Sequence, residues 1–370
     1  MSRLRSRLAV LPRALAQRAL YKRRPPEKLE RILIAHHLLL GDTILLTPLL
    51  AKLRSNHSQA QVVMTAPRAV AALYEGRPYG VRVVAIDPHD AGSLAQLFAW
   101  HTFDLAIVPG ENRYAWLALA AGARWIRAHA GESQAYKNWP VDELRPYPTM
   151  PAAWGDIIAE LVSGPAPAPF NPVDWPAPSC KPFVLPSSPR YAVLHVGAST
   201  PLKCWEPPKW RALAARLSSA GIQAVFLAGP GEDAILDAVA LGRDDVRYPG
   251  NLELSQVWHL LRAAQILIAP DTGIAHLGRA AGVPTVALYG PGSALISGPG
   301  EFWRESPFRA VTMRDFPCRD QRFIFYRPID WARTCTRSVA ECAAPRCMQS
   351  ISVDEVWRNA CELLGAAIAA

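Results

Sequence analysis

Short apolar runs rich in β-branched residues alternate along this chain with longer segments whose apolar residues recur at helical spacing. The short runs predict buried strands, and the periodic segments predict helices. The predicted strands lie at 31–35, 61–65, 81–86, 103–108, 191–195, 224–227, 266–269 and 285–288. The predicted helices lie at 43–53, 66–74, 208–220, 233–241, 255–264, from Thr272 onward, and at 353–369. Alternation of this kind is typical of βαβ units with a parallel sheet, so we predict an α/β fold.

A proline-dense stretch at 164–189 interrupts this alternation. Proline has no backbone N–H to donate, so the stretch favours neither a regular helix nor a central strand, and we interpret it as a semi-rigid linker. It would separate an N-terminal domain at 25–163 from a C-terminal domain at 190–352, followed by a C-terminal helix at 353–370. Two similar α/β halves predict a binding cleft between them.

Positive charge is concentrated in a basic tail at residues 1–24. The tail holds eight cations and no acid, so the rest of the chain contributes only +1 to the net charge of +9. A nucleic-acid-binding protein spreads its cations over the folded domain, so no nucleic-acid partner is predicted. Leucines recur at helical spacing among the arginines of the tail, at Leu4, Leu8, Leu11 and Leu15. The pattern predicts either an amphipathic helix on an anionic membrane surface or a solvated, partly disordered extension.

Other compositional features restrict the class of protein. No apolar run approaches the roughly 18 residues of a membrane-spanning helix, and the tail lacks the apolar core and cleavage site of a secretory signal. Seven cysteines are too few for a disulfide scaffold in a chain of 370 residues, so we predict a cytoplasmic protein. The cysteines nearest the C-terminus lack paired CxxC spacing, which favours structural thiols over a zinc site.

The loops that follow predicted strands are candidate binding sites, because ligands of parallel sheets bind beyond the carboxyl ends of the strands. The first of these loops contains Gly41, Asp42 and Thr43. A carboxylate such as Asp42 can act as a general base when a substrate hydroxyl lies within hydrogen-bond reach. The alternative is that Asp42 only caps the helix that follows.

The loop after the strand at 191–195 offers groups that bind phosphate: a glycine that allows close approach, two hydroxyls and a compact ammonium. These groups belong to Gly197, Ser199, Thr200 and Lys203. A plain turn with a solvated lysine is the alternative. His195, at the end of the strand, is predicted to be a core histidine.

A further loop carries Asp271, Thr272 and Gly273 directly after a predicted strand, with His276 one turn into the next helix. The amides at a helix N-terminus together with the Thr272 hydroxyl would form an anion site, and Asp271 would orient the loop. An ordinary capped helix is the alternative.

The sequence at 229–234, GPGEDA, formally matches a dinucleotide-binding fingerprint. Its acidic residues would face a pyrophosphate with like charge, so an NAD-dependent oxidoreductase is only a distant alternative, and Glu232 could instead contact a ribose. The chain has no Asp-x-Asp pair to hold a divalent ion against a diphosphate. We therefore predict no metal and no cofactor. If a nucleotide diphosphate leaves during the reaction, Lys203, Thr272 and helix amides must stabilise the negative charge that develops on it.

Four segments, in order along the chain, resemble glycosyltransferase family nine, whose best-known members are the ADP-heptose:lipopolysaccharide heptosyltransferases. They are ILIAHHLLLGDTILLTPLLAKLR, VLHVGASTPLKCWEPPKWRALAARL, APDTGIAHLGRAAGVPTVALYGP and CMQSISVDEVW. The stretch HHLLL at 36–40 departs from the family, which often has an arginine and small residues there.

The resemblance implies a GT-B fold of two Rossmann-like domains. It also implies inverting transfer of a heptose from ADP-heptose to a lipid-linked lipopolysaccharide core acceptor, at the cytoplasmic face of the inner membrane. By matching positions, Asp42 would be the catalytic base, flanked by Gly41 and Thr43 on the acceptor side, and Glu232 would lie near the ribose. The donor diphosphate would be bound by Lys203, Thr272 and Gly273, in a site lined by Ser199, Thr200, Asp271 and His276.

Three alternatives stay open at this point. A family member could use another nucleotide sugar or a non-lipopolysaccharide acceptor. The chain could bind a nucleotide sugar without catalysis, although Asp42 together with Lys203 argues against this. The oxidoreductase is the third.

Overall fold

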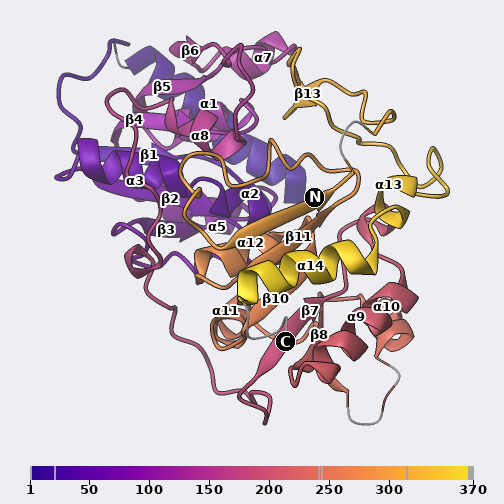
Figure 1. Ribbon diagram of the computed structural model, residues 1–370. Coiled ribbons are helices and arrows are strands. Elements are labelled where there is room, and N and C mark those ends of the chain that lie inside the picture. Colours follow the sequence, from indigo (N-terminus) through magenta and orange to yellow (C-terminus); the bar gives the residue numbers. More distant parts are fainter. Residues whose placement is uncertain (1, 21, 241, 243–244, 314–315, 366–370) are drawn as a thin grey trace. The chain divides into compact units, whose positions relative to one another are not determined.

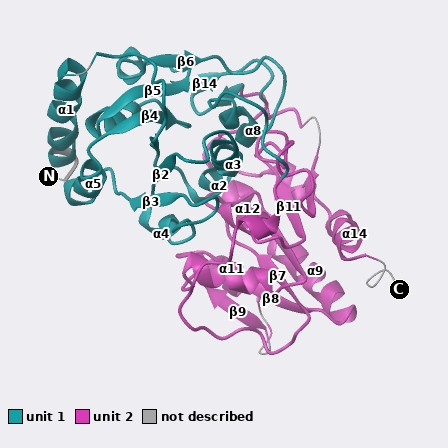
Figure 2. Cartoon of the chain, turned by 90° about the vertical axis from the view of Figure 1, so that its left-hand side faces the viewer, with its two compact units in different colours: residues 1–169, 322–332 teal, residues 170–321, 333–370 magenta. Residues whose placement is uncertain are grey.

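The computed structural model describes residues 2–20, 22–240, 242, 245–313 and 316–365. The chain forms two compact units, each built from two stretches of sequence (Figure 2). Unit 1 comprises Met1–Pro169 and Arg322–Ala332, and unit 2 comprises Phe170–Gln321 and Arg333–Ala370. The predicted C-terminal domain at 190–352 includes residues 322–332, whereas the structure places them in unit 1.

Unit 1 is built around a six-stranded parallel sheet with strand order β3-β2-β1-β4-β5-β6 (Figure 1). Its central strands are buried on both faces, which explains their continuous apolar sequences. The strands are β1 (Arg31–Ile34), β2 (Gln61–Ala66), β3 (Arg82–Ala85), β4 (Phe103–Val108), β5 (Ala123–His129) and β6 (Glu143–Arg145). The strand order reverses between β1 and β4, and this switch point is where ligands of doubly wound sheets bind.

Helices connect and cover these strands. They are α1 (Ser2–Leu20), α2 (Leu40–Ile44), α3 (Thr47–Asn56), α4 (Arg68–Ala71), α5 (Ala91–Phe98), α6 (Tyr114–Ala120), α7 (Ala135–Asn138) and α8 (Trp154–Ala159). The helix predicted at 43–53 is two helices, with Pro48 in the first turn of α3, where proline is tolerated. The helix predicted at 66–74 is reduced to the single turn of α4.

The basic tail is helical and packed. Helix α1 contacts α5 and α6, and its Ala14 belongs to the hydrophobic core of unit 1. Arg18 and Arg23 both form ion pairs with Asp142, which anchors the end of the tail. The alternative of a solvated, disordered extension is therefore wrong for the described part of the tail. No helix in the ranges described above is long and apolar enough to cross a membrane.

Unit 2 repeats the same topology. Its parallel sheet has the order β12-β11-β10-β7-β8-β9. Read from β9 and with β7 counted as the first strand, this is the strand order of unit 1. The strands are β7 (Tyr191–His195), β8 (Gln223–Ala228), β9 (Val246–Pro249), β10 (Ile266–Pro270), β11 (Thr285–Tyr289) and β12 (Phe308–Thr312). Its switch point lies between β7 and β10.

The helices of unit 2 follow the predicted alternation closely. They are α9 (Pro207–Ser219), α10 (Asp233–Val239), α11 (Leu254–Arg262), α12 (Gly273–Ala280), α13 (Arg346–Gln349) and α14 (Val353–Leu364), with single 3-10 turns η1 (Pro172–Asp174) and η2 (Pro201–Lys203). Helix α14 packs against α9 and against strands β10–β12. It ends at Leu364 because Gly365 adopts a left-handed φ of 75°, and the predicted continuation over residues 366–370 lies outside the described residues.

The proline-dense stretch contains only η1 as a regular element among its described residues. From Phe170 onward it belongs to unit 2 and is fixed there by aromatic contacts. The ring of Phe170 lies 4.2 Å from that of Trp303, and the ring of Trp175 lies 5.4 Å from that of Trp258. These contacts anchor the unit 2 part of the stretch.

Candidate functional site

Asp42 lies in the first turn of α2, just beyond the carboxyl end of β1. The helix begins at Leu40 with Leu39 as its N-cap, so Asp42 is not the cap, and the capping alternative is wrong. Its carboxylate is partly exposed and sits where the helix dipole favours negative charge. The buried Thr43 donates its hydroxyl to the carbonyl of Leu39 at 2.8 Å, which fixes the loop that carries Asp42.

His36 organises the same loop from inside. It is fully buried, and its Nδ1 accepts a hydrogen bond of 3.1 Å from the backbone N–H of Leu38. Burial lowers the pKa of His36 to about 3, so the imidazole is neutral at physiological pH. His36 therefore contributes no charge to the loop that carries Asp42.

Lys203 and Asp271 form the centre of the unit 2 site. Lys203 ends η2, after β7, and its Nζ donates to the backbone carbonyl of Asp271 at 2.9 Å and to Oδ2 of Asp271 at 3.1 Å. A Cβ atom at Gly292 would lie 2.1 Å from that carboxylate oxygen, so the close approach of Asp271 requires glycine there. The alternative of a solvated lysine is wrong, because Lys203 is only partly exposed and is hydrogen-bonded.

Thr272 is the N-cap of α12, but its hydroxyl does not cap the helix. Its Oγ1 is buried and has no hydrogen-bond partner within the described part of the chain. Gly273 and Ile274 open the helix, and the first amides of a helix have no intrahelical acceptor. The N–H of Ala275 already donates to the carbonyl of Thr272 at 3.1 Å. A buried hydroxyl without a partner costs free energy, and at the N-terminus of an eight-residue helix it supports a binding site for an anion.

His276 is buried behind this helix start. Its Nε2 lies 3.9 Å from Oδ1 of Asp271, and Nη2 of Arg279 lies 2.7 Å from its Nδ1. Burial, followed by the charges of Arg279 and Lys203, lowers the pKa of His276 well below its usual value. His276 is therefore neutral and supports Asp271 without adding charge.

Glu232 joins two loops of unit 2. Its Oε2 accepts the backbone N–H of Gly229, and a Cβ atom at Gly197 would lie 1.6 Å from the same oxygen. The carboxylate of Glu232 thus occupies the turn of the GPGEDA segment and places a negative charge there. Glu232 also links the loop after β8 to the loop after β7, which carries Lys203.

The remaining predicted positions are two hydroxyl residues of the loop after β7 and one histidine at the end of that strand. Ser199 is exposed, and Thr200 caps η2 by accepting the N–H of Leu202 at 3.4 Å. His195 is confirmed as a core histidine: it is buried, its Nδ1 lies 3.2 Å from the carbonyl of Leu227, and burial lowers its pKa to about 4. Roles for Ser199 and Thr200 in donor binding stay predictions.

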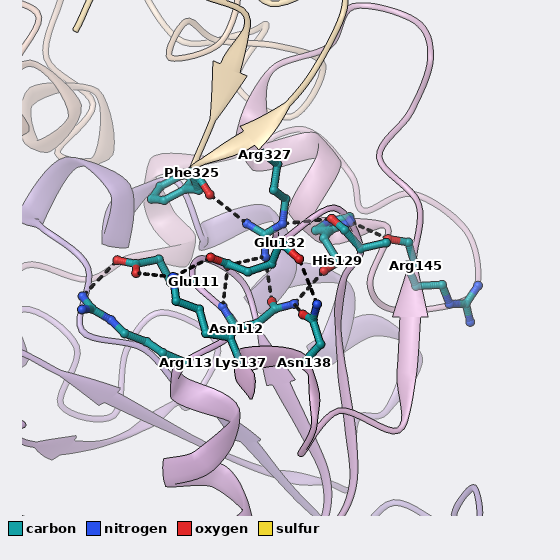
Figure 3. A network of polar contacts seen from close by, with 11 residues as sticks. Glu111, Asn112, Arg113, His129, Glu132, Lys137, Asn138, Arg145, Phe325 and Arg327 are labelled. Carbon is teal, nitrogen blue, oxygen red and sulfur yellow. Dashed lines mark hydrogen bonds and ion pairs between the residues drawn. The ribbon is translucent and has the colours of Figure 1, made fainter. Parts of the chain in front are cut away.

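A charged network at the carboxyl ends of β4 and β5 was missed by the sequence analysis (Figure 3). Its centre is Arg327, whose side chain is fully buried in unit 1. Arg327 donates from Nη2 to Oδ1 of Asn112 at 2.7 Å and from Nε to the carbonyl of Ala130 at 3.0 Å. Its Nη2 also lies 3.6 Å from Oε2 of Glu132.

The same network includes a second buried cation. Lys137 pairs with Oε1 of Glu132 at 2.6 Å, and its Nζ lies 3.7 Å from Oε2 of Glu111. Glu111 in turn pairs with the more exposed Arg113 at 2.9 Å (Figure 3). Charges buried in this way are tolerated because each is paired and hydrogen-bonded.

Part of this network was detectable in the sequence. Glu111 and Asn112 follow the predicted strand at 103–108 almost directly, so the rule that singled out Asp42 applies to them as well. Arg327 carried no such signal, because it is far away in sequence and follows no long strand.

No group of three or more His, Cys, Asp or Glu side chains in the described ranges is placed to hold a metal ion. All seven cysteines are free thiols.

Comparisons with known proteins agree with this architecture. A model of glycosyltransferase family 9 (heptosyltransferase) matches residues 92–301, more than half of the chain. Lipopolysaccharide heptosyltransferase 3 of Escherichia coli is 23% identical over 313 residues, which cover 76% of this chain and 89% of that protein.

Solved structures show the same fold. A family 9 glycosyl transferase from Veillonella parvula has a TM-score of 0.70 at 17% identity, over 91% of this chain and 98% of that chain. The E. coli ADP-heptose lps heptosyltransferase II has a TM-score of 0.68, with the same identity and coverage. The predicted GT-B fold class, with two Rossmann-like domains, is confirmed, and the oxidoreductase alternative is set aside. Since the family model matches more than half of its length, the chain belongs to glycosyltransferase family 9, the heptosyltransferases, and is a glycosyltransferase.

Proposed function

We propose that this enzyme transfers a heptose from ADP-heptose to a lipopolysaccharide core acceptor with inversion at the anomeric carbon. The observation that carries the proposal is the chemistry at the two switch points. Unit 2 offers an ammonium, an unpartnered buried hydroxyl and helix amides, which suit a diphosphate. Unit 1 offers the partly exposed carboxylate of Asp42, which can accept the proton of an acceptor hydroxyl.

In the proposed reaction, Asp42 takes the proton of an acceptor hydroxyl as its oxygen forms the new bond to the anomeric carbon. The bond from that carbon to the diphosphate oxygen breaks, and ADP leaves with the electron pair. Lys203, the Thr272 hydroxyl and the first amides of α12 stabilise the negative charge that grows on the leaving group. Asp271 and His276 hold Lys203 and the helix start in place, and Glu232 supports the neighbouring loop.

These donor contacts support transfer without a divalent ion, because a fixed cation and oriented dipoles do the work that magnesium does elsewhere. The test is a transfer assay with ADP-heptose and a truncated core lipopolysaccharide acceptor, in excess chelator. Full turnover is expected. Loss of turnover that a particular divalent ion restores would overturn metal independence, and the donor assignment would survive.

Family 9 membership leaves the nucleotide base and the sugar open, so the donor needs its own test. A thermal-shift screen of nucleotide diphosphates and nucleotide sugars is expected to give the largest stabilisation with ADP and ADP-heptose, since ligands that bind only the folded state raise its melting temperature. Stronger stabilisation by another nucleotide sugar would replace ADP-heptose as the donor.

We also propose that α1 holds the enzyme on the inner face of the inner membrane, beside its lipid-linked acceptor. One side of α1 is packed in unit 1 around Ala14, while Leu8 (63% exposed), Leu11 and Leu15 project to solvent. Exposed arginines flank these leucines, and an apolar stripe among cations suits an anionic lipid surface.

Point variants test this better than deletion of the tail, because deletion would uncover the core around Ala14. Replacement of Leu8, Leu11 and Leu15 by Gln is expected to abolish co-sedimentation with anionic vesicles while transfer to a soluble acceptor stays unchanged. Equal recovery of the variant and the wild type on vesicles would exclude a membrane role for α1.

A further inference from the structure

Residues 322–332 form a small hairpin on unit 1, although the chain on either side of them belongs to unit 2. Its strands are β13 (Phe323–Ile324) and β14 (Arg327–Pro328), paired antiparallel. The two residues of the turn, Phe325 and Tyr326, both have positive φ, at 45° and 64°. Two-residue turns of this kind normally contain Asn and Gly, so two aromatic residues there are costly.

The surrounding contacts keep this strained turn in place. Arg327, the residue after the turn, is tied to Asn112, Ala130 and Glu132, and its Nη1 also donates to the carbonyl of Phe325 at 3.3 Å (Figure 3). The ring of Phe325 lies 4.6 Å from the ring of Trp154. The turn is thus fixed from both sides, and its conformation is imposed by the packing of unit 1.

The turn lies beside the loop that leads into Asp42. A Cβ atom added to Gly110 would lie 3.0 Å from Leu38 Cδ2 and 3.8 Å from Phe325 Cδ1, so these two side chains converge on Gly110. Leu38 belongs to the loop between β1 and α2, and Gly110 follows β4. Phe325 therefore places the turn next to the loops that follow β1 and β4, at the switch point of the unit 1 sheet, where a ligand is expected.

The turn presents Tyr326 to solvent, with its side chain 70% exposed. The Nζ of Lys137 lies 5.8 Å from the centre of the Tyr326 ring, and the alternating charges of Glu111 and Arg113 continue from Lys137. An aromatic face next to paired carboxylates and cations matches a saccharide, whose C–H face packs on a ring and whose hydroxyls bind charged groups.

We propose that Tyr326 is an acceptor-specificity residue: its ring binds the saccharide that receives the transferred sugar, and Arg327 is the positioning residue that holds the turn. This inference rests on the proposed transfer reaction. The strain supports it, because the tyrosine occupies a φ that favours glycine while 70% of it stays exposed and its ring contacts the edge of the network through Lys137. Unusual backbone of this kind concentrates at functional sites.

Steady-state kinetics of Tyr326→Ala and Tyr326→Phe test the proposal. The alanine variant is expected to raise the KM for the acceptor saccharide about tenfold, since aromatic contacts of this kind are worth up to about one factor of ten. The KM for ADP-heptose and the kcat should change less than about twofold. The phenylalanine variant keeps the ring and should retain the acceptor KM of the wild type.

Tyr326→Gly separates binding from folding. Glycine accepts the positive φ without strain, so its melting temperature should be unchanged or higher, while the acceptor KM rises as in the alanine variant. A role in folding alone predicts the opposite pattern, with a lowered melting temperature and an unchanged acceptor KM.

The outcomes distinguish this inference from the proposed function. If the wild-type enzyme transfers heptose and Tyr326→Ala keeps the wild-type acceptor KM, the role of Tyr326 is overturned and the function stands. If the wild type transfers no sugar to any lipopolysaccharide core acceptor, the proposed function is overturned and the inference falls with it.

Discussion

The two units share one strand order but differ in what they place at the switch point. In unit 2 the site is made by loops that directly follow β7, β8 and β10, and it leaves polar groups unsatisfied, above all Oγ1 of Thr272. In unit 1 the carboxyl edge carries a network of paired charges that is completed by Arg327, a residue from the far end of the chain.

The difference separates two uses of polar groups. The Oγ1 of Thr272, unpartnered within the described residues, costs free energy until a ligand accepts from it. Lys203, although paired with Asp271, stays partly exposed. The unit 2 edge is therefore suited to bind an anion.

The buried charges of Arg327, Glu132 and Lys137 are paired with one another, so they are suited to hold other residues in position. The more exposed pair of Glu111 and Arg113 faces solvent, where a saccharide could reach it. If this comparison is right, variants in the unit 1 network should mainly lower stability, whereas variants at the unit 2 site should mainly weaken ligand binding.

The largest effect is expected for Asp42→Asn. Loss of a general base lowers kcat by about 10²–10⁴-fold, whereas the Kd for ADP should stay unchanged. Steady-state kinetics and calorimetric titration with ADP measure the two quantities. Asp104→Asn is the matched control, because Asp104 binds the backbone N–H groups of Glu30 and Arg31 near the start of β1. A kcat for Asp42→Asn above a tenth of the wild-type value would refute the assignment of the base.

Arg327→Met should mainly reduce stability. It leaves buried polar partners such as Asn112 unsatisfied and removes one cation from Glu132, so a loss of about 3 kcal/mol is expected. Urea denaturation followed by tryptophan fluorescence reports the change. Lys28→Met, which breaks an exposed pair with Glu30, should leave stability nearly unchanged. Equal stability of the two variants would mean that the buried network does not hold the unit 1 edge.

Lys203→Met addresses the opposite edge. A hydrogen bond to a charged group is worth about 1.5–3 kcal/mol, so the Kd for ADP should rise about 10- to 100-fold. Lys209→Met is the control, because the Nζ of Lys209 binds the carbonyl of Ile351 at 3.1 Å and, in the described part of the chain, none of the residues of the proposed donor site. Titration calorimetry that finds the same ADP affinity for both variants would remove Lys203 from the donor site.

Thr272→Val gives the smallest and most diagnostic effect. The variant should weaken ADP binding by up to about tenfold without lowering the melting temperature, because Oγ1 has no partner to lose in the described structure. Thr285→Val is the matched control: its buried Oγ1 donates to the carbonyl of Val283 at 2.8 Å, so the variant should lose stability and keep its ADP affinity. The reverse pattern would mean that Thr272 is structural.

Sequence reasoning worked best where the signal was local. The strands β4 and β7 were predicted with their observed bounds, and the loops carrying Asp42, Lys203 and Thr272 were found because each follows such a strand. It failed where packing decides, as in the division of 43–53 into α2 and α3. It also left open whether the basic tail folds, and the tail packs through Ala14 into the core of unit 1.

By itself the sequence determined the two α/β halves, the positions of the loops at the strand ends and the segments that resemble family nine. All of these depend on residues close together in the chain, whose periodicity and turn chemistry set local backbone conformation. Only the tertiary structure decided that residues 322–332 pack on unit 1 and that Lys203 pairs with Asp271. It also decided that the Thr272 hydroxyl is left without a partner in the described residues. These depend on contacts between residues far apart in sequence, which local patterns do not encode.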